Sequence, residues 1–275
     1  AQMVMSLTHF YSALPRVLTL ARSLLDLLME GYVGREPDKA RHFAILERRR
    51  AVRLGLTGMT AGIDDPDQVS SIEELSVALM GEPGTGKSKF LKRFSQLLEE
   101  PIYHEKYGVW QLPILRIRFP PDGRNLHALA TYIILAIDRK LPEHGYREKY
   151  LRTSQKSGNA MERLRIAEDL LHLHFVGLLL VDEAQDSKFA EKSAGSSTDP
   201  LKDAKPEGEQ PILTLLIAAS NTFGIPLVLV GTGELHDVMQ RRMSRGRRCD
   251  GYGVEYWGKL KMSGSLTDPD EYELL

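Results

Sequence analysis

The chain has 275 residues, 42% hydrophobic and 27% charged, a composition typical of globular proteins and large enough for a proper core. Its 36 lysines and arginines balance 37 aspartates and glutamates, which argues against a general polyanion binder but leaves room for a local basic segment. The single cysteine, Cys249, excludes an intrachain disulfide, and with no membrane-length apolar run and no basic leader the sequence favours a reduced, cytosolic protein.

Two regions follow one another along the chain. Residues 1–54 are mostly helical in pattern, with apolar residues three and four apart, and are expected to form an N-terminal extension. Residues 55–275 are expected to form one α/β domain, with a polar, Gly/Pro/Ser-rich insertion at 186–210. Apolar runs suited to buried strands lie at 76–80, 113–119, 177–182 and 225–231, with a weaker fifth at 253–260. Helical patterns separate them at 87–98, 125–140, 160–174 and 211–222. This alternation predicts a five-stranded, mainly parallel sheet between helices.

The segment GEPGTGKS, residues 81–88, follows the first strand and opens a helix. It has the pattern G-x-x-x-x-G-K-[ST] in the context that a P-loop requires, where backbone amides and a helix N-terminus face phosphate. Lys87 is expected to reach the β- and γ-phosphates of ATP, and Ser88 to hold Mg²⁺. The alternative is a glycine-rich turn with a chance lysine. The residues expected to bind the nucleotide here are Glu82, Pro83, Gly84, Thr85, Gly86, Lys87, Ser88 and Lys89.

Two later strands end in polar residues. The strand in GLLLVDEAQD ends at Asp182, which is expected to lie beside the magnesium. The adjacent Glu183 is expected to polarise the attacking water. Two neighbouring carboxylates with different tasks indicate hydrolysis rather than nucleotide storage, although a merely polar strand end is the alternative. LVLVGTGE would point Thr232 at the γ-phosphate if its strand lies beside the other two, but apolar strands also end in Gly-Thr without such a role.

This order of elements resembles the AAA+ ATPases, which are P-loop NTPases. Within them, GYVGR (31–35) resembles the segment that lines the adenine pocket, with Val33 and Gly34 nearest the base. Five segments together resemble the TnsC/TniB group, the target-selection ATPases of Tn-seven-like transposons, including CRISPR-associated ones. They are GYVGREP, PIYHEKY, LLLVDEAQ, LVLVGT and the arginine-rich RRMSRGRRCDGYG…YW. The resemblance covers roughly residues 30–260 and lacks the C-terminal lid, so the chain is expected to be a fragment.

Residues 241–248, RRMSRGRR, hold five arginines in eight positions. The resemblance implies that Arg247 or Arg248 enters the neighbouring subunit's site as an arginine finger, a role that contributes about 10³- to 10⁵-fold in rate. A solvated charge run and a DNA contact are the alternatives.

The resemblance also implies a homo-oligomer, a six- or seven-membered ring or a helical filament, around double-stranded DNA. Its partners would be transposase subunits and a TniQ/TnsD-like target selector, in the bacterial cytoplasm and on the nucleoid when DNA is bound. The residues expected to contact DNA lie in two loops and are Arg124, Thr153, Lys156 and Ser157. For any one of them a solvated loop residue is the alternative.

Two other functions stay open: an AAA+ initiator or helicase-loader type ATPase, and an ATP-binding scaffold with little turnover. His172 and His174 are two apart, which puts them on different sides of a helix, so we interpret them as core or surface histidines rather than a metal pair.

Overall fold

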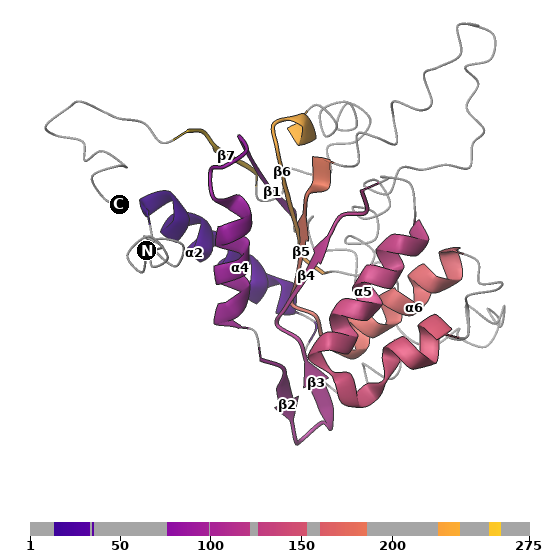
Figure 1. Cartoon of the computed structure of the whole chain (residues 1–275). Coiled ribbons are helices and arrows are strands. Elements are labelled where there is room, and N and C mark those ends of the chain that lie inside the picture. Colours follow the sequence, from indigo (N-terminus) through magenta and orange to yellow (C-terminus); the bar gives the residue numbers. More distant parts are fainter. Residues whose placement is uncertain are drawn as a thin grey trace, which may run out of the picture.

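The computed structural model describes residues 14–33, 35, 76–98, 100–121, 126–152, 160–185, 225–236 and 253–259. They contain a five-stranded parallel sheet with the strand order β4-β5-β6-β1-β7 (Figure 1). Its strands are β1 (Ser76–Gly81), β4 (Ile114–Arg118), β5 (Leu178–Asp182), β6 (Leu227–Gly231) and β7 (Val254–Trp257). The α/β prediction is confirmed, and the weak fifth strand is the edge strand β7 beside β1.

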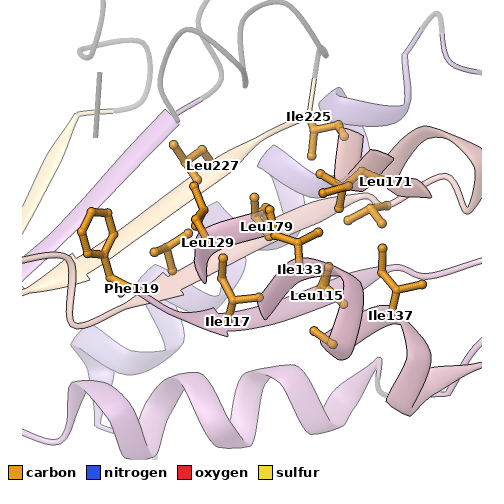
Figure 2. Packing of buried hydrophobic residues seen from close by; sticks show 14 of the residues in the cluster. Leu115, Ile117, Phe119, Leu129, Ile133, Ile137, Leu171, Leu179, Ile225 and Leu227 are labelled. Atoms are coloured by element: carbon orange, nitrogen blue, oxygen red, sulfur yellow. The ribbon is translucent and has the colours of Figure 1, made fainter. Parts of the chain in front are cut away.

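Helices cover both faces of this sheet. The helices α5 (Leu126–Lys140) and α6 (Ala160–Leu173) share one hydrophobic cluster with the sheet, and Figure 2 shows Ile133 and Ile137 of α5 beside Leu115 and Ile117 of β4. The helices α2 (Pro15–Tyr32) and α4 (Lys87–Leu97) share a second cluster on the opposite face. Because both faces are buried, the central strands are continuous apolar runs without a polar alternation.

Helix α2 is a layer of the α/β unit, whereas the sequence pattern placed it in a separate N-terminal extension. Its residues Leu24 and Leu27 are fully buried in the cluster shared with the sheet. The helix begins near β7, where Arg16 donates to the carbonyl of Gly258 at 3.1 Å. It ends beside the residues that precede β5 and β6, and therefore runs opposite to the strands (Figure 1).

A small hairpin was not predicted from the sequence. The strands β2 (Ile102–His104) and β3 (Val109–Gln111) pair antiparallel, and β3 leads almost directly into β4, so the hairpin projects from the edge where β4 begins (Figure 1). Three-residue strands are too short to produce a recognisable alternation. Two short helical segments, η2 (Pro142–His144) and the π-helix η3 (Arg147–Arg152), follow α5. No helix in the described ranges is both long and apolar enough to span a bilayer.

Candidate nucleotide-binding site

The loop between β1 and α4 is open at its glycines. Gly84 and Gly86 have φ angles of 84° and 90°, the left-handed region that glycine adopts without strain. A Cβ added at either position would lie more than 4 Å from every described atom outside the adjoining residues. The backbone of this loop therefore presents a bare surface that a phosphate group could approach closely.

Lys87, the first residue of α4, points back into this loop. Its ammonium donates to the carbonyls of Gly81 and Glu82 at 2.8 and 2.7 Å, and to the Thr85 hydroxyl at 3.3 Å. Burial lowers the pKa of Lys87, and attraction from Asp182 and Glu183 opposes this shift. The three acceptors are neutral oxygens, so a phosphate oxygen would be a stronger partner for the same ammonium.

Asp182, the last residue of β5, has a separate partner for each carboxylate oxygen. Its Oδ1 accepts from the Ser88 hydroxyl at 3.3 Å and from the backbone N–H of Glu183 at 3.1 Å. Its Oδ2 accepts from the Arg116 guanidinium of β4 at 2.7 Å. The structure thus brings the hydroxyl and the carboxylate of the predicted metal site together. Hard oxygen ligands of this kind fit Mg²⁺.

Glu183 is held in an unusual backbone conformation next to the tip of β6. Its φ of 61° is rare for a residue with a side chain. The amide of Gln185 donates to the Glu183 carboxylate, and the carbonyl oxygen of the same amide accepts from the backbone N–H of Thr232 at 3.3 Å. The Thr232 hydroxyl is buried, with no hydrogen-bond partner among the described residues. The polar ends of β5 and β6 therefore meet, as the sequence prediction for Thr232 required.

Comparison with known families agrees with this geometry. A family described as AAA domain matches residues 72–239, more than half of the chain. The chain belongs to the AAA domain family. The matched range contains the loop, the acidic end of β5 and the tip of β6, and the domain is accordingly a nucleotide-dependent AAA+ ATPase. A search of curated proteins finds no match.

Three further residues predicted to bind nucleotide lie in the loop or in the first turn of α4. The carboxylate of Glu82 is paired with Lys259 at 3.2 Å, and its carbonyl holds Lys87 and the Thr85 hydroxyl. Pro83 is exposed at the turn of the loop, and Lys89 is exposed in the first turn of α4.

Val33 lies at the opposite edge of the sheet from the loop, contrary to the prediction that it lines the adenine pocket. It caps the C-terminal end of α2, and the neighbouring Tyr32 donates to the carbonyl of Phe175 at 3.0 Å. Phe175 precedes β5, whereas the loop follows the far end of β1. The prediction came from the resemblance of GYVGR to an adenine-pocket segment, and that resemblance carries no information on the direction of α2 across the sheet.

The other predicted site residues lie outside the described ranges. They are the adenine-pocket residue Gly34, the DNA-loop residues Arg124, Thr153, Lys156 and Ser157, and the finger candidates Arg247 and Arg248. The insertion at 186–210 and the helix predicted at 211–222 also lie outside them.

Two residues of the site were missed by the sequence predictions. Arg116 is a charged residue inside the apolar run PILRIRF, and Gln185 is a polar residue just after the two carboxylates. Both carried a weak signal, a polar side chain at a strand or its end, but neither reveals its partner without the strand order. His174 is a core histidine, whose Nε2 lies 2.7 Å from the Tyr146 hydroxyl.

Proposed function

We propose that this AAA+ domain binds ATP at the loop and hydrolyses it. The observation that carries the proposal is that Asp182 and Glu183, adjacent in sequence, are held by different kinds of partner. Asp182 is 7% exposed and ion-paired with Arg116, which fixes it beside Ser88. Glu183 is less buried and is held by a neutral amide, which leaves it able to accept a hydrogen bond from a water molecule.

Each group has a task that follows from its place. Lys87 would exchange its carbonyl partners for phosphate oxygens, and the open glycines would admit the phosphate chain. Ser88 and Asp182 would hold Mg²⁺, which neutralises charge on the phosphates when bound. Thr232, with its buried hydroxyl, would donate toward the γ-phosphate or the water, and Glu183 would orient that water.

The wider role that we propose is that of a target-selection ATPase of the TnsC/TniB kind. ATP binding would build an oligomer on duplex DNA, the oligomer would recruit a transposase, and hydrolysis would dismantle it. Three of the quoted segments lie in the described structure: IYH forms β2, LLLVDEAQ supplies β5 and the acid pair, and LVLVGT forms β6 and its polar tip. Arg124 and Lys156, with Thr153 and Ser157 as neutral donors, would contact DNA phosphates without reading sequence.

The test of nucleotide binding is the substitution Lys87→Ala. Removing a buried ammonium that would make charge-assisted bonds should weaken the binding of a fluorescent ATP analogue about 100-fold. Association with duplex DNA should be lost with it, because assembly is proposed to need ATP.

Lys92→Ala is the matched control, since Lys92 is an exposed lysine further along the same helix. It should bind nucleotide as the unmodified protein does. Unchanged affinity of the Lys87 variant would exclude the loop as the nucleotide site. Nucleotide-independent assembly on DNA would leave the ATPase proposal standing and refute the proposed switch.

The proposed oligomer makes a second prediction, because a finger acting between subunits makes each site composite. Glu183→Gln keeps the finger but lacks the group that orients water, and Arg247→Ala/Arg248→Ala keeps Lys87 and Glu183. Mixing the two inactive proteins should restore part of the ATPase rate, measured across mixing ratios at constant total protein. A rate that never exceeds that of the separate variants would exclude the finger assignment.

A further inference from the structure

Arg116 is the one charged residue whose side chain crosses from β4 to the acidic end of β5 in the described structure. On β4, Leu115 and Ile117 pack into the cluster under α5 and α6, while Arg116 faces the α4 side. The strand register sets Arg116 opposite Leu180 and sets Arg118 opposite Asp182. The guanidinium of Arg116 therefore reaches forward along the sheet to meet the carboxylate at 2.7 Å.

This contact fixes how the carboxylate of Asp182 is oriented toward the loop. Its two oxygens are equivalent, but the carboxylate plane could turn about the Cβ–Cγ bond so that neither oxygen faces Ser88. Because Oδ2 accepts from Arg116, Oδ1 is the oxygen left beside the Ser88 hydroxyl and the Glu183 backbone N–H. A charge-assisted hydrogen bond of this length is among the stronger ones in proteins, so it holds the carboxylate in this orientation.

We propose that Arg116 is a positioning residue, which aims Oδ1 of Asp182 at the place where Ser88 would hold Mg²⁺. The inference rests on the proposed ATP-binding function and deepens it. It assigns to β4, a strand from which no site residue was predicted, a part in the dependence of nucleotide affinity on Mg²⁺. The Arg116 guanidinium bonds the Asp182 carboxylate, so the proposed role acts through Asp182 and not through the nucleotide.

The experiment compares nucleotide affinity in Mg²⁺ with affinity in EDTA, using a fluorescent ADP analogue. Arg116→Met keeps the unbranched stem of the side chain and removes the guanidinium. It should reduce the gain in affinity that Mg²⁺ gives by about tenfold, because Asp182 loses its orientation. Affinity in EDTA, which depends on the loop and Lys87, should stay within about twofold of the unmodified protein.

Arg118→Met is the matched control on the same strand and the same face. Arg118 is exposed, and its Cα lies opposite that of Asp182, so it tests whether any nearby positive charge suffices. Its Mg²⁺ gain should equal that of the unmodified protein. Arg116→Lys should recover part of the gain, because an ammonium keeps the charge but has a shorter reach and no planar fork.

Three outcomes separate the inference from its alternatives. If Arg116→Met weakens binding equally in Mg²⁺ and EDTA and lowers the melting temperature, Arg116 supports the fold and the inference is refuted. An unchanged Mg²⁺ gain in a folded Arg116→Met protein refutes it as well, while leaving the proposed function intact. Failure of the unmodified protein to bind nucleotide in either condition would instead refute the proposed function.

Discussion

The loop at the carboxyl edge of the parallel sheet and the end of α2 at its amino edge use glycine in opposite ways. At the carboxyl edge, Gly84 and Gly86 have positive φ angles and open space around them. At the amino edge, a Cβ added to Gly31 would lie 2.3 Å from a ring carbon of Pro226, and one added to Gly177 would lie 2.4 Å from the Tyr32 hydroxyl. Glycine keeps the loop accessible to a ligand and allows the end of α2 to pack tightly against the sheet.

The arginines at the two edges also have different kinds of partner. At the carboxyl edge, Arg116 is paired with an acid that belongs to the candidate site. At the amino edge, Arg35 donates to the backbone carbonyls of Gly31 and Val176 and lies over the Tyr32 ring, and burial lowers its pKa to about 10. The guanidinium there secures the end of α2 to the sheet. Parallel α/β sheets bind ligands at the carboxyl ends of their strands, and the amino edge is left to serve stability.

The largest effect that would test this division is expected at the amino edge. Gly177→Ala places a methyl group against Leu28 and the Tyr32 ring, and overpacking of this kind should cost about 2–3 kcal/mol in the free energy of unfolding. Urea denaturation measures it. The remaining folded protein should bind nucleotide normally, and a weakened affinity with unchanged stability would contradict the assignment of this edge.

A somewhat smaller effect is expected from the same substitution at the carboxyl edge. Gly84→Ala meets no clash, but the left-handed φ costs a side chain about 1–2 kcal/mol and the methyl group enters the open side of the loop. Nucleotide affinity should fall about tenfold, or 1.4 kcal/mol. Titration of a fluorescent ATP analogue measures it. Equal affinity in the variant would show that the phosphates do not pass over Gly84.

The smallest effect concerns pH, and it should appear in stability alone. Burial, with a smaller contribution from Tyr150, raises the pKa of Tyr146 to about 12. The unfolded chain ionises this tyrosine near pH 10, so its contribution to stability is complete below pH 10 and is lost as pH rises toward 12. By pH 11 the loss should be about 1 kcal/mol.

Tyr146→Phe should remove this fall of the unfolding free energy between pH 9 and pH 11. It should also lower the unfolding free energy by a constant amount at every pH, because the bond to His174 is missing. Urea unfolding at pH 9, 10 and 11 measures the slope, with Tyr103→Phe on the exposed hairpin as the control. An identical slope in the Tyr146 variant and the unmodified protein would show that this hydroxyl is not protected from ionisation.

Local pattern was enough to predict much of this protein. The five strands of the parallel sheet and the helices α4, α5 and α6 were foreseen within a few residues, because burial on both faces of a parallel sheet leaves continuous apolar runs between amphipathic helices. The loop of residues 81–88 was equally visible, since its left-handed turns demand glycine and its chemistry demands a lysine at the helix start. Both predictions depend only on residues that are close together in the sequence.

What depends on neighbours in space was decided by the tertiary structure. Arg116 meets Asp182 only because β4 lies beside β5, and Gln185 joins Glu183 to Thr232 only because β5 lies beside β6. Val33 lies far from the loop because α2 runs opposite to the strands, with Arg16 bonded to Gly258 at its start and Tyr32 bonded to Phe175 at its end. Periodicity shows which face of an element is buried, but not which element it is buried against or in which direction it runs.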